Sequence, residues 1–156
     1  MRYFFFGSLM DAEVLGIVLG RAVMSEEMRP AKLSDYRVVG VRNESYPALC
    51  AERGASASGV VVEGISDRQA QRLQYFEADE YAPEICKVEL SGGDCVPARV
   101  FLATESLAHT TDDWSFADFQ ADGRAVFVEA TRQWMVSMAM LGMVMGLSDT
   151  VRANRV

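Results

Sequence analysis

The chain has 156 residues and a formal net charge of −7, with 50% hydrophobic and 24% charged residues. This balance predicts an ordinary soluble globular protein, with one domain over residues 1–156 that buries a sizeable core. The acidic charge argues against a nucleic-acid partner and against docking on an anionic membrane, because both surfaces attract basic patches. No stretch reaches the ~20 apolar residues that a membrane-spanning helix needs.

Cysteine and histidine are scarce, which limits the metal and redox chemistry that the chain can support. The three cysteines, Cys50, Cys86 and Cys95, form no CxxC pair and are odd in number. A disulfide framework is therefore not expected, and a reducing cytoplasm is the simplest location. His109 is the single histidine, and no Cys/His spacing resembles a zinc site. Because His109 lies in the polar stretch 104–113, we expect it in a loop.

The chain opens on a short aromatic run, residues 2–6, that predicts a buried strand. The glycine after this strand, Gly7, would let the backbone approach a ligand closely. Successive N–H groups of Gly7, Ser8 and Leu9 could then cradle a carboxylate or a carbonyl oxygen. A tight strand-to-helix turn with no ligand is the alternative interpretation of the same residues.

A short helix and several extended stretches follow. The helix is expected from about residue 11 to 19, where a glycine ends it. The residues of 32–41 favour a strand, and 59–65 is typical of a strand that is buried on both faces. Between them, 45–50 resembles a turn leading into a short strand, and the small polar run 52–59 is expected to be a loop.

A helix from residue 67 to about 77 comes next, and Glu77 at its end is the most informative residue of the chain. A capping-box spacing at 66–69 predicts where this helix begins. On a helical wheel Glu77 lies within about 40° of both Ala70 and Leu73. The glutamate is therefore expected on the core-facing side of the helix.

The position of Glu77 has two interpretations. A carboxylate on a core-facing side is costly unless it has a partner or a role, and desolvation would raise its pKa, which suits a general acid/base. The alternative is a helix-end glutamate that turns outward to water. Tyr46 and Tyr81 also have two interpretations each, because each phenol could line a pocket or could pack with one end in water.

The second half of the chain combines a hairpin with a helical tail. Strands are expected over 86–90 and 96–102, joined by a turn of sequence SGGD. A linker over 103–113 would lead to a short capped helix near 115–118 and then to a longer helix from about 123 to 147. Strands and helices do not alternate regularly, which predicts an α+β fold.

The run 134–147 within this tail is rich in methionine and is too short for a membrane span. Methionine-rich faces adapt to partners, so a core helix or an oligomer interface is favoured over a ligand-binding segment. If the run is an interface and not part of the core, it predicts a homo-oligomer. An interaction protein that works through this helix is one of the functional alternatives.

Three segments occur in a notable order: YFFFGSLM at 3–10, YPAL at 46–49 and LQYFEADEY at 73–81. In order and spacing they resemble the γ-glutamylcyclotransferase-like family, and its AIG2-like branch most closely. The family pattern is an aromatic strand ending in YGSL or YGTL, a YPA segment, and a helix ending in FEG with a tyrosine after it. The resemblance covers roughly residues 1–102, and the tail at 115–147 carries no recognised motif.

The resemblance implies a role for each matched residue. Glu77 matches the catalytic glutamate, and the loop that begins at Gly7 matches the backbone amides that hold the γ-glutamyl group. Tyr81 matches the tyrosine that follows the glutamate. The substrate-binding residues expected on this basis are Phe6, Gly7, Ser8, Leu9, Tyr46 and Tyr81.

The resemblance also implies a fold and a reaction. The fold is a small mixed β-barrel with a few helices packed around it. In the reaction, the α-amino group of a small γ-glutamyl compound attacks its own γ-carbonyl, and the products are 5-oxoproline and a free amine. Neither a metal nor an organic cofactor is implied. One carboxylate with a raised pKa could take the proton of the attacking amine and supply the proton of the leaving amine.

Two residues depart from the family pattern. Phe6 stands where the family usually has tyrosine, so a hydroxyl is missing from the junction. Ala78 replaces the usual glycine after the glutamate, which bears on how the helix ends. Both departures motivate the alternative function, a non-catalytic small-molecule binding module that retains the family pocket.

Overall fold

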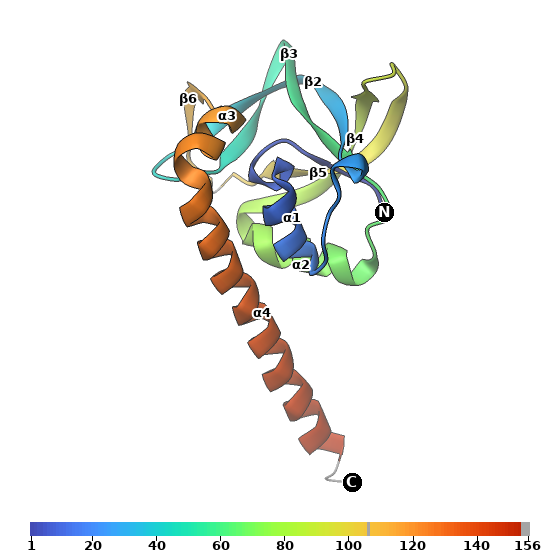
Figure 1. Ribbon diagram of the computed structural model, residues 1–156, viewed down its shortest axis with the longest axis vertical. Coiled ribbons are helices and arrows are strands. Elements are labelled where there is room, and N and C mark those ends of the chain that lie inside the picture. The colour runs from blue at the N-terminus through green and yellow to red at the C-terminus, as the bar shows by residue number, and fades with distance from the viewer. Residues whose placement is uncertain (106, 154–156) are drawn as a thin grey trace.

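The computed structural model describes residues 1–105 and 107–153, with side chains described up to residue 142. In this part of the chain five strands close into a small barrel, with a sixth strand on its edge (Figure 1). The barrel strands are β1 (Tyr3–Phe5), β2 (Arg29–Val41), β3 (Pro47–Val62), β4 (Tyr81–Leu90) and β5 (Cys95–Ala103). Their order is β3-β1-β5-β4-β2, and a second pairing of β2 with β3 closes the ring. Because β1 and β5 run parallel while their neighbours run antiparallel, the predicted α+β fold with a small mixed barrel is confirmed.

Three helices pack against this barrel: α1 (Ala12–Leu19), α2 (Asp67–Glu77) and α4 (Arg124–Ala153). In Figure 1, α4 passes the barrel and projects beyond it towards the C-terminus. Among the described helices, none combines the length and the apolar character that a bilayer crossing requires. The short elements are η1 (Ser8–Met10), η2 (Ser25–Glu27), η3 (Ala78–Glu80), β6 (His109–Asp113), α3 (Phe116–Asp118) and the π-helical turn η4 (Phe119–Gly123).

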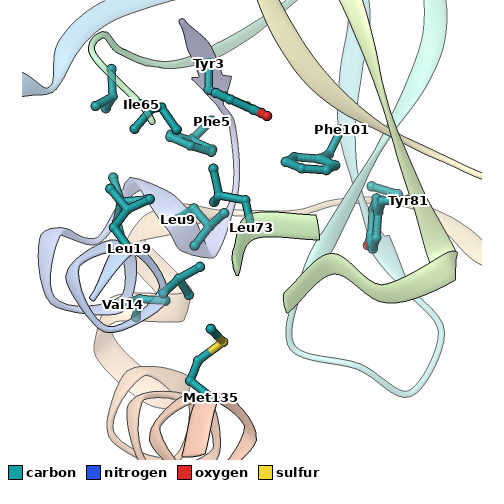
Figure 2. Packing of buried hydrophobic residues seen from close by; sticks show 14 of the residues in the cluster. Tyr3, Phe5, Leu9, Val14, Leu19, Ile65, Leu73, Tyr81, Phe101 and Met135 are labelled. Atoms are coloured by element: carbon teal, nitrogen blue, oxygen red, sulfur yellow. The ribbon is translucent and has the colours of Figure 1, made fainter. Parts of the chain in front are cut away.

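The three aromatic residues of β1 connect the barrel interior to the helices. Side chains alternate between the two faces of a strand, so Phe4 packs inside the barrel while Tyr3 and Phe5 pack on the helical side. All three are nearly inaccessible to solvent. Figure 2 shows Met135 of α4 extending towards Val14 of α1 in the same helical-side cluster. The aromatic run is therefore buried on both faces, as its composition predicted.

Ion pairs fix the start of α4 to α1. Arg124 lies 2.6 Å from both Asp11 and Glu13, and Arg132 lies 2.6 Å from Glu13. Asp11 is also the N-cap of α1, where its side chain accepts hydrogen bonds from the amides of Glu13 and Val14. Burial opposes ionisation of Asp11, but the Arg124 hydrogen bond and these two amides together hold its pKa below the usual value. The buried Asp11 carboxylate thus caps α1 and also pairs with the first residue of α4.

The capping box predicted for α2 is present. The Ser66 hydroxyl accepts a hydrogen bond from the Gln69 amide at 3.2 Å, and the Gln69 side chain accepts one from the Ser66 amide at 3.0 Å. The helix then runs to Glu77, where it was expected to end. Gly20 likewise ends α1, with a left-handed φ of 73°. Local sequence rules therefore placed both helices correctly.

The loop predicted over 52–59 is wrong, because β3 includes these residues, with a register shift in its pairing with β2 between Ala51 and Ser56. Two of its small residues, Ala57 and Gly59, lie where the barrel leaves no room for larger ones. A Cβ atom on Gly59 would lie 2.2 Å from the carbonyl oxygen of Phe5 and 2.6 Å from the Phe4 ring. Ala57 is likewise almost fully buried, with 1% of its surface exposed. Small residues that resemble a loop in sequence are here a consequence of close strand packing.

The linker predicted over 103–113 is also wrong in part. β6 pairs antiparallel with β2, with Val39 opposite Asp113 and Val41 opposite His109. His109 therefore begins a strand and does not lie in a loop. β6 is mostly exposed and polar, and it adds to the edge of β2, so it lacks the apolar alternation that marks a half-buried strand.

Several boundaries differ from those expected. β4 begins at Tyr81 instead of residue 86, because Pro83 and the exposed Ile85 hide the pairing with β5. β2 begins at Arg29, three residues before the expected start at 32, and β3 ends at Val62 instead of residue 65. The long helix α4 was expected to end near 147 and continues to Ala153. In the methionine-rich run 134–147, the side chains from 143 onward lie outside the described residues.

Candidate active site

A cavity of about 530 Å³ lies where the helices meet the barrel. Its volume falls in the range of about 300–1,000 Å³ that is usual for small-molecule sites. The cavity is lined by the end of β1, the starts of β3 and β4, the end of α2 and one face of α4. All the residues predicted for the site line it: Phe6, Gly7, Ser8, Leu9, Tyr46, Glu77 and Tyr81. The fold therefore brings three segments that are distant in sequence into one place.

Glu77 is the last residue of α2, and its half-buried side chain lines the cavity. Desolvation by the surrounding protein is the main reason that the pKa of this carboxyl rises from 4.5 to about 8, and the nearby charge of Glu80 adds to the rise. Near neutral pH such a group is present both with and without its proton. It can therefore accept a proton from one group and return it to another.

The strand-to-glycine junction forms another side of the cavity. Gly7 precedes the 3₁₀ turn η1, and no described side chain caps this turn. The first amides of a helical turn have no hydrogen-bond acceptor inside that turn. The amides of Ser8 and Leu9 therefore make no hydrogen bond within η1. The carbonyl oxygen of Gly7 accepts from the Met10 amide at 2.9 Å. A Cβ atom on Gly7 would lie only 2.6 Å from the ring of Pro47, so this approach requires glycine.

Two tyrosines meet edge to face beside Glu77. The ring centroids of Tyr46 and Tyr81 are 6.4 Å apart. The Tyr81 hydroxyl donates to the carbonyl oxygen of Pro47 at 2.8 Å, and the Tyr46 hydroxyl donates to the Glu80 carboxylate at 3.1 Å. Burial is the main cause of the raised pKa of both phenols. The second cause is the charge of Glu77 for Tyr81 and the charge of Glu80 for Tyr46. Both hydroxyls therefore keep their protons at physiological pH.

One wall of the cavity comes from α4 and was not among the predicted site residues. Phe127, Ala130, Thr131 and Trp134 all line it. Their spacing of three, four and seven residues places them on one face of the helix. This spacing is visible in the sequence, but no motif there connects it to the N-terminal segments. Sequence reasoning placed Trp134 in a core or an interface, whereas the structure places it at the cavity.

Aromatic contacts join this α4 wall to α2. The ring of Trp134 stacks on Tyr75 with the centroids 5.1 Å apart, and its indole N–H donates to the Tyr75 carbonyl oxygen at 3.4 Å. Phe127 meets Phe76 edge to face at 6.4 Å. Because Phe76 immediately precedes Glu77, the α4 wall lies next to the helix end that carries the carboxyl.

The family model described as gamma-glutamyl cyclotransferase, AIG2-like, matches residues 3–118 of this chain. The chain belongs to this family. The match contains all three sequence segments that carried the resemblance, and it includes every residue of the predicted site. All of α4, with Phe127 and Trp134, lies beyond the matched residues.

Two curated relatives from Arabidopsis thaliana show how far the similarity of this AIG2-like chain extends. AIG2-like protein D is 32% identical over 136 residues, which cover 84% of this chain and 86% of the relative. AIG2-like protein C is 24% identical over 137 residues, which cover 85% of this chain and 76% of the relative. Both alignments cover more than four fifths of this chain.

Solved structures share the fold of this AIG2-like chain. An Arabidopsis thaliana protein studied in solution aligns with a TM-score of 0.63 at 17% identity, over 88% of this chain and 91% of that one. A structure described as gamma-glutamyl cyclotransferase aligns with a TM-score of 0.56 at 16% identity, over 85% and 86% of the two chains. At these identities the alignments establish the barrel fold with its packed helices.

The two departures from the family pattern have clear structural settings. Phe6 is 8% exposed and packs with the barrel interior while it also lines the cavity. Ala78 adopts φ 54° and ψ −155°, a backbone region that is essentially restricted to glycine. The glycine usual in the family would adopt this conformation without strain, so alanine makes the helix end after Glu77 less stable.

Among the described residues, no group of three or more histidine, cysteine, aspartate and glutamate side chains is arranged to hold a metal ion. All three cysteines are free thiols.

Proposed function

We propose that this chain is a γ-glutamyl cyclotransferase that releases 5-oxoproline and a free amine from a small γ-glutamyl amide or amine. The observation that carries the proposal is Glu77, a carboxyl with a pKa of about 8 that shares one cavity with the Gly7–Leu9 junction. Membership of the AIG2-like family supports the same reaction.

In the proposed reaction, Glu77 moves two protons, one after the other, from the α-nitrogen of the substrate to its leaving nitrogen. The α-ammonium group gives a proton to the Glu77 carboxylate, and the freed amine attacks the γ-carbonyl carbon. A bond forms between the α-nitrogen and the γ-carbon, which closes the five-membered ring. The bond between the γ-carbon and the leaving nitrogen then breaks as that nitrogen takes the first proton from Glu77. The ring nitrogen gives its remaining extra proton to the Glu77 carboxylate, which passes it to the released amine. No other reactant is consumed, so a single acid/base group suffices.

The other predicted residues hold the substrate in the cyclising geometry. The amides of Gly7, Ser8 and Leu9 bind the γ-glutamyl oxygens and stabilise the charge that develops on the carbonyl oxygen. Phe6, Tyr46 and Tyr81 form the walls around the glutamyl chain. Because the nucleophile already belongs to the substrate, its positioning contributes much of the rate.

The proposed setting is the cytoplasm, with which the three free thiols are compatible. A single domain over residues 1–156 and a homo-oligomer formed through the methionine-rich part of α4 both stay predictions. Val136, Met140 and Leu141 are more than half exposed on this helix, so Met140→Glu would disrupt such an assembly. Measurement of the mass in solution tests the homo-oligomer.

The test of the proposed function is 5-oxoproline release from a panel of γ-glutamyl amides and amines by the purified protein. Turnover that is absent from a blank without protein supports the enzyme. The alternative is a binding module that keeps the pocket, which the missing hydroxyl at Phe6 and the strained Ala78 favour. Calorimetric binding of γ-glutamyl compounds with no release of 5-oxoproline from any of them would establish this alternative.

A further inference from the structure

We infer that the leaving amine has an apolar, aromatic body and carries no carboxylate, and that the α4 wall recognises this body. The inference rests on the proposed cyclotransferase function and adds the class of amine that is released. The α4 wall is defined as Phe127, Ala130, Thr131 and Trp134.

The cavity has a size and a lining that suit an aromatic ligand. A γ-glutamyl group is small, whereas a volume of about 530 Å³ accommodates a considerably larger ligand. Beyond Glu77, the cavity is bounded by the rings of Phe76, Phe127 and Trp134. Flat apolar rings of this kind bind another aromatic body by burial and by offset or edge-to-face contact. The part of the substrate that is not glutamyl therefore has an aromatic surface to meet.

The lining of the cavity is also acidic. Three carboxyl side chains line it, from Glu77, Asp79 and Glu80, and none of its described lining residues is lysine, arginine or histidine. Arg124 and Arg132, the arginines of α4 whose side chains the structure describes, are already paired with Asp11 and Glu13 at the start of α1. A carboxylate on the leaving group would enter an acidic cavity without a cationic partner, which is costly.

The amides of the strand-to-glycine junction do not offset the cost of a carboxylate on the leaving group. These few amides, from Gly7 to Leu9, are assigned to the glutamyl part of the substrate, which has a carboxylate of its own. A second carboxylate on the leaving group would have no comparable set of donors among the described lining residues. Amino acids and peptides are therefore poor leaving groups, whereas simple arylalkyl amines are good ones.

The α4 wall is fixed against the rest of the cavity, because Trp134 stacks on Tyr75 and Phe127 contacts Phe76 next to Glu77. It lies beyond residues 3–118, the range that the family model matches. The selectivity for the amine is therefore assigned to α4.

The experiment compares three substrates that differ in one feature each. They are the γ-L-glutamyl derivatives of 2-phenylethylamine, of ethylamine, which lacks the ring, and of L-phenylalanine, which adds a carboxylate to the same body. We expect kcat/KM for the phenylethylamine derivative to exceed that for each of the others by about tenfold or more. Similar values for all three would overturn the inference while leaving the cyclotransferase function in place.

Two variants test whether the α4 wall is responsible. Ala130 is exposed and lines the cavity, so Ala130→Phe fills space there without disturbing the core. It should reduce the preference for phenylethylamine over ethylamine at least severalfold, as should Trp134→Ala. Val136→Ala, an exposed position on α4 that is not among the lining residues, is the matched control and should keep the preference. A preference that survives both Ala130→Phe and Trp134→Ala would contradict the role of the wall.

Direct binding separates this inference from the proposed function. If no γ-glutamyl compound yields 5-oxoproline, the proposed function fails, and calorimetry with the free amines then tests the cavity by itself. Binding of 2-phenylethylamine that is stronger than that of ethylamine and of L-phenylalanine, and is weakened by Ala130→Phe, supports the aromatic site. Absence of such binding together with absence of selective turnover overturns it.

Discussion

The phenol of Tyr81 donates a buried hydrogen bond to the main-chain carbonyl oxygen of Pro47 across 2.8 Å. Tyr81 begins β4 shortly after Glu77, and Pro47 begins β3 with its ring against Gly7. This single contact therefore links the end of the glutamate helix to the strand-to-glycine junction. It holds together the two parts of the cavity on which the proposed chemistry depends.

Replacement of Tyr81 by phenylalanine should destabilise the protein by about 1–3 kcal/mol, because the buried carbonyl of Pro47 would lose its donor. Urea unfolding measures this change. Tyr46→Phe is the matched control, since its hydroxyl lies at an exposed contact with Glu80 and its loss should cost less than about 1 kcal/mol. Equal losses of unfolding free energy in the two variants would show that the Tyr81 hydrogen bond stabilises the protein no more than the exposed Tyr46 contact does.

Gly7→Ala should also destabilise the protein, by about 1–3 kcal/mol, because the new Cβ would lie within 2.6 Å of Pro47 and force the two segments apart. Gly92→Ala provides the comparison, since nothing lies within 4 Å of a Cβ atom at that position. Its effect should stay within about 1 kcal/mol. Thermal unfolding of both variants checks the prediction. Equal stability of Gly7→Ala and the unsubstituted protein would show that the close approach to Pro47 does not require glycine.

Ala78→Gly should stabilise the protein by about 1 kcal/mol. The present φ of 54° and ψ of −155° strain an alanine, and relief of this strain outweighs the greater freedom of glycine in the unfolded chain. Ala70→Gly, inside α2, should instead cost about 1 kcal/mol. Denaturant unfolding that shows a loss for both variants would mean that the strain at Ala78 is negligible.

The raised pKa of Glu77 predicts a pH-dependent loss of stability. Below its ordinary pKa of 4.5 the carboxyl is protonated in both the folded and unfolded states, so it carries no penalty. As pH rises from 4.5 to about 8, only the unfolded state releases the proton, and stability falls. Above pH 8 the full penalty applies, at about 2 kcal/mol after allowance for water that reaches the cavity.

Glu77→Gln removes this titration and gives a direct comparison. Its free energy of unfolding, measured between pH 5 and pH 9 at about one-unit intervals, should decline less than that of the unsubstituted protein. At pH 9 the variant should be the more stable of the two. Parallel curves for the two proteins would show that Glu77 titrates as it does in water.

Much of this architecture is readable in the sequence because local rules decide it. The capping box of Ser66 and Gln69 and the glycine at the end of α1 fixed two helices, and the three family-like segments correctly predicted the barrel. The site residues of these segments could be proposed together because the family pattern links them. Whether Glu77 faces a cavity could not be decided, since the helical period permits both orientations.

The errors have a common physical origin in long-range packing. Small residues around Gly59 suggested a loop because the sequence does not show how closely Phe4 and Phe5 approach them. The polar strand β6 lacks alternation because it lies exposed at the edge of β2. The α4 wall was missed because the sequence does not show that Phe127 and Trp134 line a cavity, which is formed by segments distant in sequence.

The most direct test of the proposed chemistry compares 5-oxoproline release by Glu77→Gln and Glu80→Gln with that of the unsubstituted protein. Both carboxyls line the cavity, but only Glu77 is assigned the proton transfers. We predict that Glu77→Gln lowers kcat/KM by about 10²-fold or more, while Glu80→Gln lowers it by less than about tenfold. An unchanged rate in Glu77→Gln would contradict the central claim.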